Sequence, residues 1–503
     1  MELDFQRAHL ERYDPVVDTV MSQEVTAESI VPDAFPDVSR VVCTFGDAYI
    51  TTKQVFAHNV KIMGTAHLHV LYIPEGESLP RSLALELPFQ CNGDFPQLSD
   101  QDIVHGSVIA VSAETRLLNP RKLFVKAEVK LRLHCYASHC YEVVCDLAET
   151  NPSIQTRKSE HKCHSILAVL EKPFSFSDTL RPSQAKPAIE EVLTYHTVAT
   201  GVDARYIGNK LICKGILLLS GLYRSGEELI PMQFELPFSQ ILELEGTFED
   251  GVPDTSLLLK SVECTLRDGE LDMIIDAVIQ AKIWSQQTVT MLSDLYSTAE
   301  PLDVERTMIS LCTHAERGSS RETVRKFCES GIPAKQILMS SVTMNPLNSK
   351  KADSTIQYST EAMVNLLYVS EDDALCGVSY TLPIACDVEV PQECSCSCTC
   401  RPTGEVLAVP VTGGIEVRLE AEFDWLQTKH ESKPCVASVK KGAVEVSDLQ
   451  PPSVMIRMVS KGETLWDVAK SCRSTVQDIC TANELSSEFA DWGTMLLIPT
   501  KRD

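Results

Sequence analysis

The sequence predicts a mainly β protein: three antiparallel β-sandwich-like repeats with short helical connectors, followed by a small βααβ domain. Three observations predict this fold. Apolar and polar residues alternate with a period of two in several long segments, a set of landmarks recurs at intervals of 149 and 146 residues, and the last fifty residues combine two short helical patterns with flanking strand patterns.

The internal repeat is marked by a tyrosine that closes an apolar segment and by a Leu-Pro pair that follows it. The proline comes 16, 14 and 15 residues after the tyrosine in the three copies: Tyr72 and Pro88, Tyr223 and Pro237, Tyr368 and Pro383. A glycine stands eight residues before the tyrosine in the first two copies, whereas the third has a threonine: Gly64, Gly215 and Thr360. Such regular spacing predicts three copies of one structural unit.

Each copy also contains a strand pattern about forty residues after the Leu-Pro pair. Apolar residues occupy every second position of 125–135 and of 415–425, with charged residues between them in both segments. This period is typical of half-buried strands, with one face in water and the other packed on a second sheet. Segment 60–72 alternates in the same way.

Other segments interrupt the strand pattern. Residues 302–328 have helical character, with a Gly318 break and a candidate N-cap at Ser320, and residues 166–170 could form a short helical turn. The polar stretch that ends in Pro451-Pro452 is typical of a linker. The predicted boundaries are an N-terminal segment (1–24), repeat 1 (25–160), repeat 2 (170–300), a helical connector (301–330), a divergent repeat 3 (331–427), a linker (428–453) and a C-terminal domain (454–500).

Composition excludes some functions. The formal net charge of −25 over 503 residues disfavours nonspecific binding to nucleic acid or to anionic membranes, which needs clustered Lys and Arg. No apolar run of eighteen residues is present and the first residues lack the pattern of an export signal, so we expect no transmembrane segment and a cytoplasmic protein. We therefore expect the 19 cysteines to be reduced thiols.

The C-terminal segment carries helix-start signals. Thr464 with Asp467, and Ser474 with Gln477, have the spacing of capping boxes, in which a side-chain oxygen accepts a hydrogen bond from a free N–H at the helix start. The apolar residues of each predicted helix fall on one face: Leu465, Val468, Ala469 and Cys472 in the first, and Val476, Ile479 and Cys480 in the second. Two helices over a small sheet account for this pattern.

From about Met455 to Pro499 the chain resembles the LysM family, at the turn 462–465, at 482–485 and at the closing 497–499. LysM domains usually bind glycans that contain N-acetylglucosamine. The resemblance implies a binding groove between the Gly462–Leu465 loop and the segment after Asn483. The candidate ligand- or partner-binding residues are Lys461, Gly462, Glu463, Thr464, Leu465, Trp466, Asp467, Asn483 and Leu485. Trp466 lies one position off the apolar stripe, so an interface role and a core role both stay open.

Residues 25–427 resemble the SPOCS domain of spore-forming bacteria, whose repeats open with a Pro-x-x-x-Pro segment and carry the Leu-Pro strand end. Proline-rich segments precede the first two copies, at 31–36 and 181–187. SPOCS repeats followed by LysM resemble the SipL-type spore coat morphogenetic proteins. This resemblance implies a non-enzymatic adaptor in the mother-cell cytoplasm, at the forespore surface, whose LysM domain contacts the basement-layer coat ATPase SpoIVA. The alternative is binding of peptidoglycan glycan.

No phosphate loop, His-Glu-x-x-His helix, nucleophile elbow or dinucleotide fingerprint is present, so we expect neither an enzyme nor a cofactor. Two cysteine clusters are candidate sites. The first could supply ligands to zinc, but its spacing fits no standard finger and strand alternation also explains it: Cys135, His139, Cys140, Cys145 and Cys163. We expect no metal there.

The second cluster places a cysteine at every second position of 394–400. If this segment is extended, all four thiols emerge on one face, about 6.6 Å apart, which is too far for neighbours to form a disulfide on a flat strand. Cross-linking during coat assembly is one hypothesis. The other is an accessible loop whose cysteines have no dedicated role.

Overall fold

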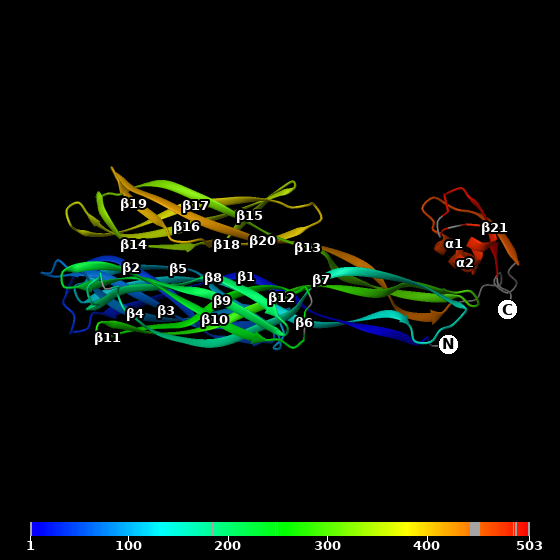
Figure 1. The fold of residues 1–503 in the computed structure, drawn as a ribbon, viewed down its shortest axis with the longest axis horizontal. Helices are drawn as coiled ribbons and strands as arrows, with labels where there is room; N and C mark the ends of the chain where they lie inside the picture. Colours follow the sequence, from blue (N-terminus) through cyan, green and yellow to red (C-terminus); the bar gives the residue numbers. More distant parts are fainter. Residues whose placement is uncertain are drawn as a thin grey trace.

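The computed structural model describes residues 3–500 except 184, 247, 249, 443–452, 486, 488 and 489. Antiparallel strands form nearly all of it, and the two short helices lie in the C-terminal domain. Figure 1 shows an elongated molecule, with packed sheets at one end, a stalk of long strands and the C-terminal domain at the far end of the stalk. No helix among the described residues is long and apolar enough to cross a membrane.

The strands form three units of the same plan. Unit 1 contains β1 (Phe5–Ile30), β2 (Val38–Phe56), β3 (Asn59–Pro74), β4 (Arg81–Asp94), β5 (Ile103–Asn119) and β6 (Lys122–Leu147). Unit 2 contains β7 (Ile154–Leu180), β8 (Glu191–Ile207), β9 (Lys210–Ser225), β10 (Glu228–Glu243), β11 (Val252–Arg267) and β12 (Glu270–Ser297). Unit 3 contains β13 (Leu302–Glu329), β14 (Ala334–Met344), β15 (Asn348–Ala352), β16 (Thr355–Ser370), β17 (Leu375–Glu389), β18 (Ser395–Pro402), β19 (Leu407–Val411) and β20 (Gly414–Lys441).

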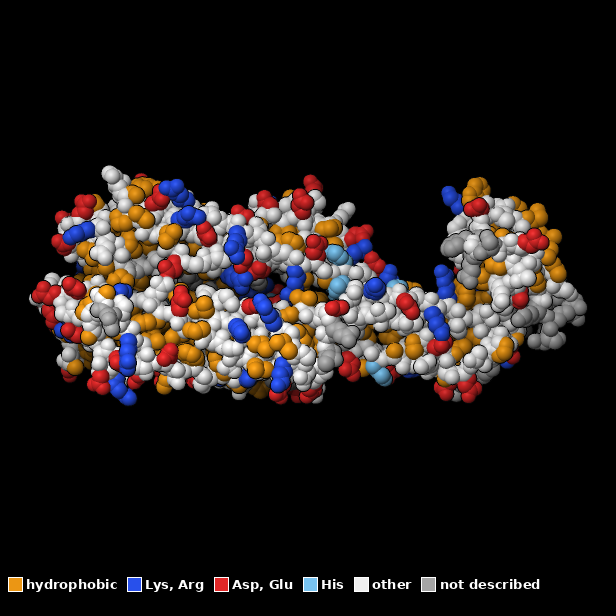
Figure 2. All heavy atoms as spheres, viewed as in Figure 1, with side chains coloured by type: hydrophobic (Ala, Val, Ile, Leu, Met, Phe, Trp, Pro, Cys, Tyr) orange, Lys and Arg blue, Asp and Glu red, His pale blue; other side chains and the backbone are white. Residues whose placement is uncertain are grey.

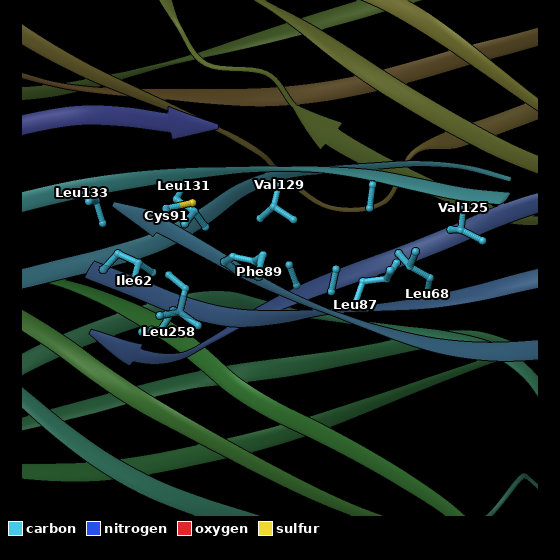
Figure 3. Close-up of a cluster of buried hydrophobic side chains, with 14 of the residues drawn as sticks. Ile62, Leu68, Leu87, Phe89, Cys91, Val125, Val129, Leu131, Leu133 and Leu258 are labelled. Atoms are coloured by element: carbon cyan, nitrogen blue, oxygen red, sulfur yellow. The ribbon is translucent and has the colours of Figure 1, made fainter. Parts of the chain in front are cut away.

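Each unit is a sandwich of two antiparallel layers. The sheet β2-β3-β4 packs on β1, β6 and β5; β8-β9-β10 packs on β7, β12 and β11; and β14, β16 and β17 pack on β13, β20 and β18. Figure 3 shows the core of unit 1, where Ile62 and Phe89 face Val129 and Leu131 of β6. Alternate residues of the predicted strand 125–135 point into this core, so the predicted sandwich is confirmed.

The Tyr and Leu-Pro landmarks have physical roles. The prolines lie within β4, β10 and β17, which pair on one side only, and an edge strand tolerates a residue without an N–H. The tyrosines end the central strands and are buried. Tyr223 donates its hydroxyl to the Pro187 carbonyl (3.0 Å) and Tyr368 to the Ile332 carbonyl (3.2 Å). Tyr223 and Tyr368 thus tie their central strands to the proline-bearing segment between the first two strands of the unit, whereas the buried Tyr72 hydroxyl has no hydrogen-bond partner among the described residues.

The glycine landmark leaves room for an aromatic ring. Gly64 lies opposite Phe89 and Gly215 opposite Phe238 in the antiparallel registers, and the ring covers the glycine. In unit 3 the equivalent pair is Thr360 with Ile384. The third copy has neither the glycine nor the phenylalanine, and the smaller Ile384 leaves space for the Thr360 side chain.

Gly215→Val is expected to lower the free energy of unfolding by about 1–3 kcal/mol, because a Cβ at this position would lie 2.7 Å from the Phe238 ring. The matched control is Gly331→Val, since no atom lies within 4 Å of a Cβ built there. Denaturant titration of both variants tests this. Equal stability of the two variants would contradict the proposed role of the glycine.

The residue before each landmark tyrosine joins the units. Leu71, Leu222 and Leu367 are fully buried in one cluster that all three units share. The rest of the cluster comes from the strands paired with these residues and from β17: Phe45, Leu193, Leu338, Met339 and Leu375. The repeat motif therefore places one leucine per unit at a common junction.

A charged pair also joins units 1 and 2. His196 of β8 is hydrogen-bonded through Nδ1 to the Asp47 carboxylate of β2. Burial by itself lowers the pKa of His196, but the attraction and hydrogen bond of Asp47 outweigh it, so the pKa lies above its usual value of 6.5. The stabilisation is therefore complete below the unfolded-state pKa and is lost as the pH rises through the raised folded-state pKa.

His196→Gln is accordingly expected to destabilise the protein more at pH 6 than at pH 9, as measured by denaturant titration at both values. His314→Gln is the control, because that histidine is half exposed on β13. A difference between wild type and His196→Gln that does not change with pH would contradict the role of the charged pair.

The longest strands of each unit continue beyond the sandwiches as the stalk. β1 pairs with β6, β7 with β12 and β13 with β20 over almost their full lengths. The stalk has its own apolar core, to which all six strands contribute: Leu10, Val143, Val144, Ile154, Cys163, Val289, Met291, Leu292, Leu295, Ile309, Leu311, Cys435 and Val436.

The stalk overturns several predicted boundaries. The segment predicted as a helical connector (301–330) is strand β13, and the helical turn expected at 166–170 lies within β7. Residues 5–24 of the N-terminal segment belong to β1, and 428–441 of the expected linker belong to β20. Residues 443–452 of that linker lie outside the described part of the chain.

The prediction of a helix at 301–330 is wrong because strand β13 is largely exposed to solvent. Most of its side chains face water, so it lacks a buried alternating face, and its conformation is imposed by β20. Gly318, expected to break a helix, instead lies opposite Trp425, whose ring comes within 2.0 Å of a Cβ built at this position. The absent side chain makes room for the indole.

Candidate functional site

The C-terminal domain consists of β21 (Val454–Met458), α1 (Leu465–Cys472), α2 (Val476–Ala482) and β22 (Met495–Pro499). Thr464 begins α1 with the predicted capping box: its Oγ1 accepts from the Asp467 N–H (3.3 Å), and the Asp467 carboxylate accepts from the Thr464 N–H (2.9 Å). The second predicted box is wrong by one residue. Thr475, not Ser474, is the N-cap of α2, because Ser474 donates its hydroxyl to the Pro499 carbonyl.

The two helices cover one face of the β21–β22 pair. The shared core contains buried apolar residues of α1, α2 and β22: Leu465, Val468, Ala469, Ile479, Leu496 and Ile498. One member comes from the stalk. Tyr296, near the end of β12, is buried in this cluster and donates its hydroxyl to the Ser474 carbonyl (2.9 Å). The domain therefore rests on the tip of the stalk (Figure 1).

Asp294 of β12 is the centre of this contact. Its carboxylate accepts a hydrogen bond from Trp466 Nε1 (2.8 Å) and from Lys470 Nζ (2.7 Å), and it pairs with Arg306 of β13. The Trp466 ring packs edge-on against Tyr296, with centroids 4.9 Å apart. Trp466 is thus engaged by the chain's own stalk. We name the contact made by Asp294, Tyr296, Trp466 and Lys470 the docking contact.

The charge state of Asp294 favours docking. Burial by itself raises the pKa of Asp294, but hydrogen bonds from Lys470, Trp466 and Arg306 together outweigh it, so the pKa lies below its usual range. A carboxylate with a lowered pKa contributes stability above its unfolded-state pKa and loses it as the pH falls through the folded value. Acidification therefore weakens this contact.

Most of the predicted binding residues also hold the domain together. Glu463 pairs with Arg457 (2.6 Å) and accepts from the Ser460 N–H. Asn483 bridges α2 and β22: its side chain donates to the Leu497 carbonyl and accepts from the Leu497 N–H, both at 2.7 Å. Leu465 is buried and Leu485 packs against the core.

Three of the predicted residues are exposed in the loop before α1: Lys461, Gly462 and the N-cap Thr464. Lys461 and Gly462 face solvent, and Gly462 has a left-handed backbone (φ 85°) with no atom within 4 Å of a built Cβ. The structure therefore brings the predicted residues into one small domain, and it leaves this loop open at the surface.

A second exposed surface was not predicted from the sequence. The β21–β22 face turned away from the helices is apolar, and its members are strongly exposed, Ile456 by 67% and Met495 by 66%. We name it the outer apolar face: Val454, Ile456, Met458, Met495 and Leu497. Trp492 is also exposed, in the turn before β22. Ile456 pairs across the sheet with Leu497, and Met458 with Met495. The signal was present in the sequence, because β21 has apolar residues on both faces.

Three of the four alternating cysteines lie on a strand, β18, and Cys394 immediately precedes it, so the expectation of a loop is wrong for Cys396, Cys398 and Cys400. Cys394 and Cys398 are buried, and Cys396 and Cys400 are half-buried against the unit 3 core. Burial raises the pKa of the Cys398 thiol to about 12 and that of Cys400 to about 12. These thiols stay protonated at neutral pH, which disfavours cross-linking.

The first cysteine cluster is spread along the stalk strands. Cys135 is in the unit 1 core, Cys163 is in the stalk core, and Cys145 contacts the Gln6 carbonyl. His139 pairs with Asp14 (3.0 Å), and Cys140 contacts His9. In the described part of the chain, no three His, Cys, Asp or Glu side chains are placed to hold a metal ion.

Thiol burial gives an expected order of reactivity. Cys140 is exposed, whereas Cys398 is buried with a raised pKa. In the native protein at pH 7.5, iodoacetamide is expected to label Cys140 well before Cys398, as followed by mass spectrometry of timed digests. Early labelling of Cys398 would show that β18 opens readily.

Comparison with known families agrees with both parts of the chain. The SipL SPOCS domain matches residues 188–267, which span β8 to β11 of unit 2, and the LysM domain matches residues 458–499. No curated protein and no solved structure matches the chain. The SPOCS match links the chain to sporulation, and the LysM match is to a family of glycan-binding domains. The chain thus combines a SipL-type SPOCS domain with a C-terminal LysM domain.

Proposed function

We propose that this protein is a non-enzymatic adaptor in spore coat assembly, active in the mother-cell cytoplasm at the forespore surface. One observation carries the proposal: the LysM domain and the three sandwiches lie at opposite ends of the stalk (Figure 1). Two separated surfaces suit a protein that joins two partners, and the second contact then forms at a raised effective concentration.

The exposed surface of the LysM domain suits a protein partner better than a glycan. The outer apolar face exposes several large side chains on one small sheet, including Ile456 at 67%. Buried aromatic and apolar anchors dominate protein interfaces. Following the SipL-type resemblance, we propose the basement-layer coat ATPase SpoIVA as the partner of this end, and other coat proteins as partners of the sandwiches.

Glycan binding is the second candidate, and the LysM match favours it. The open loop at Lys461 and Gly462 lies where the resemblance places a groove. The ligand in that case is peptidoglycan or another glycan with N-acetylglucosamine.

Binding of the full-length protein to purified SpoIVA and to insoluble peptidoglycan separates the two candidates. Met495→Glu places a charge on the outer apolar face, and Met308→Glu places one at an exposed methionine of β13 as the matched control. The adaptor proposal expects SpoIVA binding to weaken by about tenfold or more in Met495→Glu and to be unchanged in Met308→Glu. Binding to peptidoglycan alone would replace the adaptor by the glycan-binding function.

A further inference from the structure

The three units surround a central cavity of about 1100 Å³, which all three units line. Its volume slightly exceeds the usual range for ligand pockets, about 300–1,000 Å³. Figure 2 shows the surface hollowed between the sandwich of unit 3 and the two sandwiches beside it. All residues that line the cavity belong to the described part of the chain. The cavity lies among the sandwiches, at the opposite end of the stalk from the LysM domain.

Strand edges, rather than sheet faces, form the walls of this cavity. A strand that presents one face contributes every second residue to a wall, because side chains alternate across the strand. Here the lining residues come in uninterrupted runs: 107–111 of β5, 196–200 of β8, 338–346 along and after β14, and 396–402 of β18. Consecutive residues line a cavity when the main chain itself borders it.

These edges have no strand on their cavity side. Among the described residues, β5 pairs with β6, β8 with β9, β14 with β16 and β18 with β20, and no further strand pairs with any of the four. Their outward N–H and C=O groups are thus available as hydrogen-bonding groups. One of them already attracts a donor: the Cys398 carbonyl accepts from Arg132 Nη1 (3.4 Å).

A buried hydroxyl adds a second observation. Thr197 of β8 lines the cavity, is 5% exposed, and its Oγ1 has no hydrogen-bond partner in the described structure. A buried polar group without a partner costs free energy that a bound ligand can recover. The wall therefore presents unused main-chain and side-chain hydrogen-bonding capacity together.

Most of the charges around the cavity are already paired. Arg132 pairs with Asp18, His196 with Asp47, and Arg401 with the Glu422 carboxylate. The other two are of opposite sign and hydrogen-bonded, Lys186 to the Pro231 carbonyl and Glu405 to the Gln233 amide. Most of the remaining wall is small or apolar, including Ala110, Ala199, Ser340, Ser341, Val342 and Met339. Such a wall has no excess charge to attract an ionic ligand, and it suits uncharged, small or apolar side chains.

We propose that the central cavity binds an extended, uncharged segment of a partner polypeptide, which adds as a strand to one of the four free strand edges that border it. Main-chain hydrogen bonds supply the affinity and alternate side chains supply the specificity. This site is separate from the LysM surfaces, and it specifies how the sandwich end of the adaptor could hold a partner. It rests on the proposed function only in that the partner is a protein.

The test selects peptides on the full-length protein. A phage-displayed library of random twelve-residue peptides is selected on wild type, and the best peptide is synthesised for fluorescence anisotropy. Ser397→Trp blocks the cavity from β18, where the serine is exposed, and Val198→Trp blocks it from β8, where the valine is half-buried and lines the cavity. Ser395→Trp is the matched control, because Ser395 is exposed on the same strand but does not line the cavity.

Binding is expected to weaken by about tenfold or more in both blocking variants and to be unchanged in Ser395→Trp. N-methylation of the peptide at alternate residues is expected to weaken binding by roughly two- to tenfold for each hydrogen bond lost. Failure to select a peptide, or binding that is indifferent to N-methylation or to both tryptophans, would overturn the proposal. Binding of a fluorescent fatty acid in place of peptides would identify an apolar small molecule as the occupant. Binding of SpoIVA by the LysM end is scored separately, with Met495→Glu.

Discussion

Leu222→Ala is expected to lower the free energy of unfolding by about 2–5 kcal/mol, one of the two largest effects in this protein. Leu222 is fully buried in the junction cluster, where it meets side chains of all three units. Removing it leaves a cavity that rigid strands on three sides cannot fill. Denaturant titration measures the loss.

Two comparisons sharpen this prediction. Ile216→Ala on the same strand is the control, because Ile216 is exposed at the surface and its removal leaves no internal cavity. Leu71→Ala and Leu367→Ala should each cost about as much as Leu222→Ala, since the three leucines occupy equivalent positions in the units. A cost for Leu222→Ala as small as that of Ile216→Ala would contradict the common junction.

Asp294→Ala is expected to release the LysM domain from the stalk tip. The substitution removes the acceptor for Trp466 Nε1 and Lys470 Nζ and leaves the Arg306 guanidinium without its partner. Hydrogen bonds to charged groups contribute about 1.5–3 kcal/mol, so the docking equilibrium should shift toward the undocked form by about tenfold or more. Small-angle X-ray scattering should show a larger radius of gyration.

Asp303→Ala is the control, because that exposed carboxylate also lies near the stalk tip, on β13. Trp466→Phe should have a smaller effect than Asp294→Ala, since phenylalanine keeps the ring contact with Tyr296 and loses the N–H. Because the pKa of Asp294 is lowered, wild type should also expand as the pH falls through that value. Identical scattering of wild type and Asp294→Ala would show that other contacts hold the domain.

Local patterns in the sequence predicted the features that short-range physics controls. The capping box of Thr464 and Asp467 was predictable because its hydrogen bonds span three residues. The strand 125–135 was predictable because its alternate side chains enter the core. The repeat spacing predicted three equivalent units, since each landmark has a packing role within its own unit.

Features that depend on distant partners were not predictable. Strand β13 is set by its pairing with β20, about a hundred residues away, and its exposed faces carry no apolar period. The contact of Trp466 with Asp294 joins residues 172 positions apart, and no pattern near either residue marks it. The sequence therefore showed that Trp466 lies off the apolar stripe of its helix, but it did not show which residue Trp466 contacts.

The length of the stalk strands has a geometric consequence. β12, β13 and β20 each contain 28 residues, which extend over about 90 Å at roughly 3.3 Å per residue. Because each of these strands is hydrogen-bonded to a neighbouring strand over most of its length, these hydrogen bonds fix the distance between the sandwiches and the LysM domain, which cannot stretch as a coil would. The molecule can therefore act as a rigid spacer that fixes the distance between the two layers to which its ends bind.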